Sequence, residues 1–194
     1  KWDWYSVGGR WTGYFLARTG DTGSPGIMTK PAKRGRYDVV LKGDVDFTTM
    51  RAEAAKEAGK EWDAFNKVVE VTGLPPRWDD IRKKYPQDEI EKAREEYGIH
   101  PAVQALSKAD IMPWSGEVLN AYAPTREEHI RRAEDSAVVP YAVVKDGVWY
   151  QKGKMGWWGM SHDEMSQEEW NKKFWEMLRS LPDSTTLTMV DCHI

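Results

Sequence analysis

The last residues of the chain include the side chains best suited to catalysis. Asp191, Cys192 and His193 follow one another in a segment that is typical of a β-strand. Neighbouring residues of a strand point to opposite faces, so Cys192 and His193 cannot form a nucleophile–base pair with each other. A packed free thiol is the simpler interpretation of Cys192. Asp191 and His193 are two positions apart, so they share a face and can both point into one site.

A carboxylate and an imidazole on one face also suggest a metal ion. Asp3, or the cluster His162-Asp163-Glu164, would supply further oxygen and nitrogen ligands. No HExxH motif and no Cys/His zinc spacing supports such a site. We therefore predict no metal site, and we keep Asp191, His193 and Asp3 only as candidates for catalysis in a hydrolase or nuclease-like enzyme.

Tryptophan is unusually abundant, with 11 copies in 194 residues. Aromatic side chains dominate protein cores and interfaces, so a core of large rings is the ordinary interpretation. Trp157 and Trp158 are harder to explain in this way because glycines bracket their loop. Two rings cannot easily both turn inward from one short loop, so at least one is expected to line a pocket or to lie exposed.

A second candidate binding segment is Gly8-Gly9-Arg10, which lies between Trp4 and Trp11. Two successive glycines can form a tight loop whose amides hold an anion, with help from Arg10. The phosphate-binding patterns GxGxxG and GxxxxGK[ST] are both absent, and two glycines before a strand commonly form a turn or bulge. We predict ligand contacts from five residues: Trp157, Trp158, Arg10, Trp11 and Trp4.

The most basic stretch of the chain is a glycine- and proline-rich loop over residues 19–36. Its cations lie near aromatic residues, a mixture that single-stranded nucleic acid uses through stacking and charge. The whole chain, however, carries 28 basic and 31 acidic side chains and a net charge of −3. This balance gives no wider attraction to a polyanion, so we do not favour a nucleic-acid partner.

Size and composition indicate a single domain over residues 1–194, since a chain of this length buries roughly 70% of its unfolded surface. The single cysteine excludes a disulfide scaffold and suits a reducing compartment. No apolar run has the length of a membrane span, and no signal-peptide pattern opens the chain. We therefore expect a cytoplasmic protein with no membrane partner. The abrupt aromatic start at Lys1 leads us to expect a fragment or a processed chain that lacks an N-terminal segment.

Periodicity predicts the main elements. We expect strands over residues 10–18 and 185–192, a hairpin over 141–150 with an Asp146-Gly147 turn, and helices over 48–72 and 166–181. Shorter helices are expected over 77–84, 88–97, 100–108 and 125–134. Strands at both ends with helices between them indicate an α+β fold: an antiparallel or mixed sheet with helices on one face and a helical insertion over about 48–134.

Three motifs together resemble a known family. The opening Trp2-Asp3-Trp4-Tyr5 with Gly8-Gly9-Arg10-Trp11, the Met155-Gly156-Trp157 loop and the closing Val190–Ile194 segment are similar to a family of bacteriophage and actinobacterial proteins without an assigned activity. The resemblance covers both ends of the chain and is weaker in the helical middle. It implies a phage-linked cytoplasmic context, and it implies no reaction type and no cofactor.

Three functions are consistent with these residues. The one we favour is a non-enzymatic accessory factor with an aromatic-walled pocket or surface for a nucleotide-like ligand or a host protein. The tryptophan excess and the lack of a catalytic signature support it. The alternatives are a small metal-dependent hydrolase or nuclease-like enzyme that uses Asp191 and His193, and a structural or assembly protein whose aromatic residues form subunit contacts.

Overall fold

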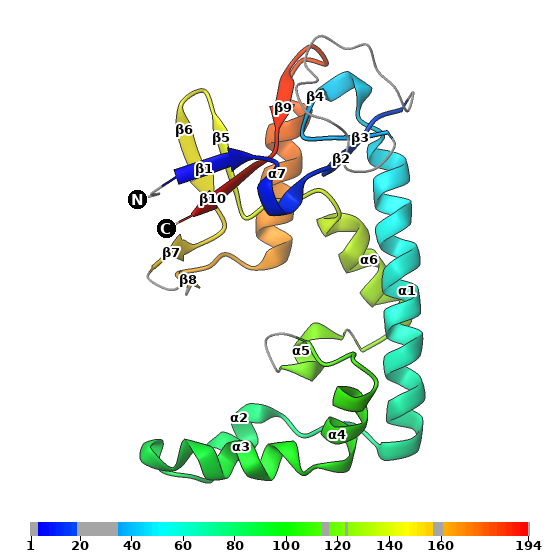
Figure 1. Cartoon of the computed structure of the whole chain (residues 1–194), viewed down its shortest axis with the longest axis vertical. Helices are drawn as coiled ribbons and strands as arrows, with labels where there is room; N and C mark the ends of the chain where they lie inside the picture. The colour runs from blue at the N-terminus through cyan, green and yellow to red at the C-terminus, as the bar shows by residue number, and fades with distance from the viewer. Residues whose placement is uncertain (1–3, 19–34, 114–116, 123, 157–160, 194) are drawn as a thin grey trace. The chain divides into compact units, whose positions relative to one another are not determined.

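The computed structural model describes residues 4–18, 35–113, 117–122, 124–156 and 161–193, and it combines helices with small antiparallel sheets in an α+β fold (Figure 1). The chain divides into two compact units. The strand unit contains Lys1–Ala52 and Asp135–Ile194, and the helical unit contains Glu53–Glu134. The helical insertion predicted from the sequence spans about 48–134.

The strand unit is assembled from both ends of the chain. Each described sheet has two antiparallel strands, in the pairs β1–β10, β2–β3, β4–β9, β5–β6 and β7–β8. Two of these pairs join the N-terminal to the C-terminal part of the sequence. Its elements are β1 (Trp4–Val7), η1 (Gly9–Trp11), β2 (Phe15–Leu16), β3 (Arg36–Tyr37), β4 (Val39–Leu41), η2 (Lys42–Asp44), β5 (Ala142–Lys145), β6 (Val148–Gln151), β7 (Lys154–Met155), β8 (Ser161–His162), α7 (Gln167–Arg179), β9 (Thr186–Thr188) and β10 (Val190–His193).

Helix α7 provides much of the core of this unit. Ser166 caps its start, and Glu169 returns the bond in the capping box predicted from the sequence. Trp170 is fully buried and donates its indole N–H to the carbonyl of Pro140, at 2.7 Å. Because a buried indole needs such an acceptor, this bond fixes the orientation of the ring. The core cluster contains Phe15, Val40, Val45, Met50, Val138, Phe174, Leu178 and Met189.

The hairpin prediction is confirmed in detail. Strands β5 and β6 pair through Asp146 and Gly147, whose φ angles are 53° and 75°. A two-residue type I′ turn requires positive φ at both central positions, and Asp-Gly is among the pairs that adopt it most readily.

The strand predicted over residues 10–18 is mostly wrong. The chain forms the short helix η1 up to Trp11, and only Phe15–Leu16 is a strand. The reason is a turn at the glycine pair: Gly8 and Gly9 have φ angles of 73° and 53°, and Gly13 has a φ of 78°. Aromatic β propensity is overridden here by the carboxylates that this turn encloses.

The helical unit follows the predicted helices closely. The helix predicted over 48–72 is confirmed, as are the shorter helices within a few residues. The elements are α1 (Phe47–Thr72), which begins in the strand unit, α2 (Trp78–Arg82), η3 (Gln87–Glu89), α3 (Ile90–Gly98), α4 (Pro101–Lys108), α5 (Val118–Ala121) and α6 (Arg126–Ser136), which ends in the strand unit.

Two small apolar clusters hold the helical unit. Phe65 stacks on Tyr122 with ring centroids 4.2 Å apart, and Tyr122 stacks in turn on His129. Gly59 lies where an added Cβ would be 2.8 Å from the Arg126 guanidinium. Arg126 also binds Asp63 through two nitrogens. Among the described residues, no helix has both the length and the apolar character that crossing a membrane requires.

Candidate functional site

Asp191 lies at the centre of a tight electrostatic contact between the two ends of the chain. Its carboxylate is 3% exposed and accepts the backbone N–H of Arg10 at 3.0 Å. The Arg10 side chain adds its Nε at 2.9 Å and its Nη2 at 2.6 Å. The hydrogen bonds and charge of Asp191 raise the pKa of the Arg10 guanidinium. We call this contact the Arg10–Asp191 latch.

The two glycines before Arg10 are required by the latch. A Cβ on Gly9 would lie 2.5 Å from Cβ of Asp191, and a Cβ on Gly8 would lie 2.4 Å from a carboxylate oxygen of Asp38. Asp38 is a second buried carboxylate, 2% exposed, and accepts the backbone N–H of Gly13 at 2.6 Å. The turn therefore wraps around two carboxylates and leaves no room for side chains.

The glycine loop binds an anion as its sequence suggests, but this anion is the chain's own Asp191. Both oxygens of Asp191 accept bonds from Arg10, so use of this carboxylate as a base would first require the latch to break. Asp191 and His193 occupy alternate positions of β10. Asp3 lies outside the described residues. Within the described ranges, no group of three or more His, Cys, Asp or Glu side chains could hold a metal ion.

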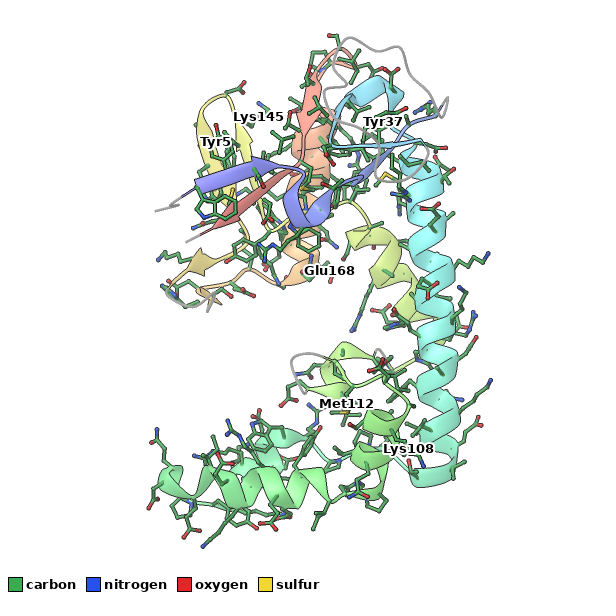
Figure 2. The ribbon with its side chains drawn as sticks, viewed as in Figure 1. Tyr5, Tyr37, Lys108, Met112, Lys145 and Glu168 are labelled. Atoms are coloured by element: carbon green, nitrogen blue, oxygen red, sulfur yellow. The ribbon has the colours of Figure 1, made fainter. Side chains whose placement is uncertain are left out.

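The residues around the latch are aromatic and exposed. Trp4, Tyr5 and Trp11 are 54%, 71% and 53% exposed, and Val7 and Val190 add further apolar surface. Figure 2 shows Tyr5 on β1. We call the β1–β10 pair the aromatic ribbon. Trp4 lies on this ribbon, and Arg10 and Trp11 lie on the turn beside it. Trp157 and Trp158 lie outside the described residues.

Cys192 is a partly buried thiol on β10. Burial raises its pKa, and the negative charge of Asp191 raises it further. A raised pKa leaves less thiolate at neutral pH, which makes the thiol a weak nucleophile. This agrees with its interpretation as a packed residue.

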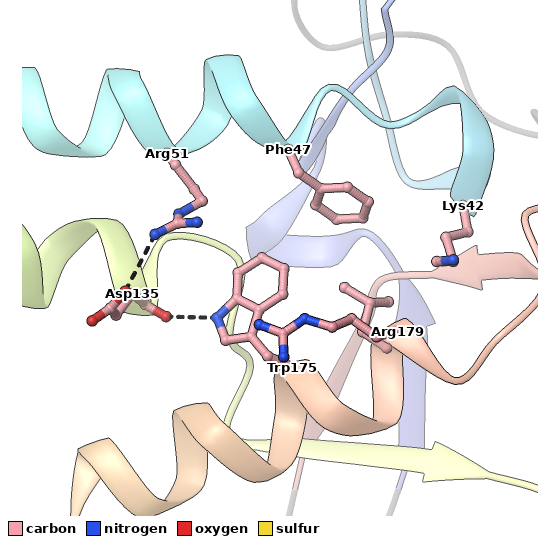
Figure 3. Close-up of a pocket in the computed structure, with 7 residues that line it drawn as sticks. Lys42, Phe47, Arg51, Asp135, Trp175 and Arg179 are labelled. Carbon is pink, nitrogen blue, oxygen red and sulfur yellow. Dashed lines mark hydrogen bonds and ion pairs between the residues drawn. The ribbon is translucent and has the colours of Figure 1, made fainter.

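A separate pocket in the strand unit combines aromatic and cationic side chains. It has a volume of about 360 Å³. Figure 3 shows its side chains converging from η2, the start of α1, the end of α6 and the last turns of α7. Its seven lining residues are Lys42, Phe47, Arg51, Asp135, Trp175, Leu178 and Arg179, and we call it the Trp175 pocket.

Hydrogen bonds hold the aromatic wall of this pocket in place. Trp175 donates its indole N–H to the backbone carbonyl of Asp135 at 3.0 Å. Its ring packs edge-to-face with the Phe47 ring, with ring centroids 6.0 Å apart. The Arg51 guanidinium lies 5.7 Å from the Trp175 ring centroid and also binds the Asp135 carboxylate at 3.2 Å. Contacts with α6 and α1 therefore hold the Trp175 side chain in place.

The charges of the Trp175 pocket are predominantly positive, with three cations and one carboxylate among its lining residues. Lys42 donates to the carbonyl of Leu181 and to Asp183, and this ion pair lowers the pKa of the Asp183 carboxyl. Arg179 is exposed and, in the described part of the chain, has no hydrogen-bond or ion-pair partner. A cation without a counterion beside an aromatic wall is suited to an anionic ligand.

Sequence reasoning missed this pocket. Its residues come from three stretches, near 42–51, at 135 and over 175–179, which only folding brings together. One signal was present: Trp175 and Arg179 are four residues apart, so they share a face of the predicted helix that differs from its apolar core face.

Comparisons with protein-family models, with curated proteins and with solved structures found no match to this chain. The resemblance to bacteriophage and actinobacterial proteins stays a prediction, as do the phage-linked context and the cytoplasmic location.

Proposed function

We propose that this is a non-enzymatic binding protein that holds a nucleotide-like ligand in the Trp175 pocket. In this proposal the planar base packs against the wall of Phe47 and Trp175, and the phosphate binds Arg179 with support from Arg51 and Lys42. The accessory role in a phage context belongs to the same proposal and depends on the sequence resemblance alone.

The observation that carries the proposal is that Arg179, which has no hydrogen-bond or ion-pair partner among the described residues, lines the same pocket as Trp175. Ligand sites typically combine an apolar or aromatic wall with a few convergent polar groups, and this pocket has that composition.

The lining residues favour binding over catalysis. They include no histidine, serine, threonine or cysteine, and so no hydroxyl or thiol nucleophile with an imidazole base. Their single carboxylate, Asp135, is paired with Arg51 and more than a third exposed. A solvated carboxylate that is already ion-paired is poorly placed to act as a general acid or base.

The size of the pocket favours a small ligand. Pockets for small molecules range from about 300 to 1,000 Å³, and this one is at the lower end. A mononucleotide fits that range better than a dinucleotide such as NAD. The positive charge of the lining residues predicts that the phosphate contributes more to the binding affinity than the identity of the base does.

The test is a thermal-shift titration of the full chain with AMP, GMP, CMP, UMP, NAD and adenosine. A mononucleotide present at a hundred times its Kd would add about 2.7 kcal/mol to the stability of the strand unit, a shift of roughly 5–10 °C. Adenosine, which lacks the phosphate, should give a much smaller shift.

Two variants on the same helix make the test specific. Arg179→Gln should weaken mononucleotide binding about tenfold because it removes a charge-assisted hydrogen bond. Lys172→Gln, an exposed cation of α7 outside the pocket, should bind like the wild type. Equal binding by both variants, or equal shifts from AMP and adenosine, would rule out the pocket as the site.

A further inference from the structure

The aromatic ribbon has an open hydrogen-bonding edge. Within the described residues, β1 and β10 pair with each other and with no third strand. The backbone N–H of Gly8 donates across the ribbon to the carbonyl of Met189, at 2.9 Å. Antiparallel strands alternate between residues whose N–H and C=O groups point to the partner and residues whose groups point away. Because Gly8 bonds to β10, the alternation predicts that the backbone groups of Ser6 and Trp4 also point to β10. The N–H and C=O groups of Tyr5 and Val7 then point to the outer edge of the ribbon.

In the described part of the chain, this edge lacks the features by which proteins protect exposed strands. Natural edge strands carry charged side chains, proline or a bulge, or are covered by a loop. Strand β1 has the sequence Trp4-Tyr5-Ser6-Val7, without a charge or a proline, and its register with β10 runs without a bulge. Its two outward-facing residues, Tyr5 and Val7, are also among its exposed apolar residues.

We propose that β1 pairs with β1 of a second copy of this chain and so joins two ribbons into a continuous four-stranded sheet. The strand is self-complementary in this arrangement. With a two-fold axis at Ser6, Tyr5 of each copy lies opposite Val7 of the other. The axis thus generates two Tyr5–Val7 pairs, and each pair exchanges two backbone hydrogen bonds. An aromatic residue opposite a β-branched residue is a favourable cross-strand pair.

Charge supports a second copy as the occupant. Two identical surfaces meet without repulsion only when their contact residues are neutral or paired, and every side chain of β1 is uncharged. The nearest cation on the ribbon's turn, Arg10, is already neutralised by Asp191. The latch also holds β1 in the extended form that pairing requires, so little ordering is needed on association. The inference is independent of the Trp175 pocket.

The first experiment measures association of the full chain by sedimentation velocity over a wide concentration range. The wild type should shift reversibly from monomer to dimer. Val7→Lys should weaken the dimer at least tenfold, because a charge at an edge strand opposes pairing. Val144→Lys is the matched control: Val144 is 63% exposed on the separate hairpin strand β5, so the same substitution should leave association unchanged.

The second experiment tests the register by disulfide formation in a Cys192→Ser background. Ser6 would face Ser6 of the second copy in a non-hydrogen-bonded pair, where Cα atoms are about 4.5 Å apart and a disulfide fits. Oxidation should therefore link Ser6→Cys chains into dimers and leave Tyr5→Cys chains mostly unlinked. A wild type that is monomeric at all concentrations, a dimer insensitive to Val7→Lys, or equal linkage of both cysteine variants would overturn the proposal.

Discussion

The latch and the Trp175 pocket contain the same types of residue and differ in how they use them. Each places an arginine–aspartate pair beside tryptophan. In the latch the aspartate is 3% exposed and binds two side-chain nitrogens and a backbone N–H of Arg10. In the pocket Asp135 is 38% exposed and binds a guanidinium nitrogen of Arg51 at 3.2 Å.

Burial of the carboxylate decides which pair is structural. A buried carboxylate that loses its donors has no water to replace them, so the latch must stay closed. A half-exposed ion pair has little more favourable free energy than its two side chains have when each is hydrated separately. Another anion can therefore replace the carboxylate at the arginine with a small loss of free energy. An arginine and an aspartate thus form a permanent structural contact in the latch and an exchangeable ion pair in the Trp175 pocket.

The largest effect should come from filling the glycine turn. Gly9→Ala combines a positive φ with a Cβ placed 2.5 Å from Asp191, and we expect a loss of on the order of 3 kcal/mol in the free energy of unfolding. Gly147→Ala has a similar positive φ with open space around it and should cost about 1 kcal/mol. Urea unfolding followed by tryptophan fluorescence measures both. Equal losses would mean that Asp191 does not confine the turn.

Removing each carboxylate charge separates the two pairs directly. We expect Asp191→Asn to lower the free energy of unfolding by about 2 kcal/mol, because buried charge-assisted hydrogen bonds are lost. Asp135→Asn should cost less than about 0.5 kcal/mol, as is usual for an exposed pair. The same urea titration compares them, and similar costs would contradict the distinction drawn from burial.

Asp135→Asn should also strengthen ligand binding. Removing the negative charge of Asp135 makes the pocket more positive and so strengthens its attraction for a phosphate, and we expect the affinity for a mononucleotide to rise about threefold. Isothermal titration with AMP measures the change. Asp191→Asn, which lies outside the pocket, is the control and should leave the affinity unchanged.

The smallest effect concerns the thiol next to the latch. Since burial and Asp191 raise the pKa of Cys192, the folded protein retains the thiol proton to a higher pH than the unfolded chain does. The resulting stabilisation is present below the ordinary thiol pKa and is lost as pH rises through the folded value. The pH midpoint of iodoacetamide labelling should therefore lie higher in the native protein than in urea.

The two aspartate variants sharpen this measurement. Asp191→Asn should lower the labelling midpoint, because it removes the negative charge beside the thiol. Asp135→Asn should leave it unchanged, so a shift in both variants would indicate a general loosening of the fold.

Elements governed by local physics could be predicted from the sequence. The long apolar stripe of α1, the Ser166–Glu169 capping box and the Asp146-Gly147 turn each depend on residues close together in the chain. The strand predicted over 10–18 failed because its outcome depends on Asp38 and Asp191, which the sequence places far away. The Trp175 pocket was missed for the same reason, since Asp135 and Lys42 meet α7 only in the folded chain.

The pairing of β1 with β10 also sets an order of events during folding. Arg10 and Asp191 are 181 positions apart, so the loop that brings them together has a high entropic cost and is expected to close late. The contacts of the helical unit lie within one continuous stretch and can form while synthesis continues. The ribosome must therefore synthesise β10 before Arg10 finds its counterion. Until then the glycine turn and its tryptophans are accessible to chaperones and proteases.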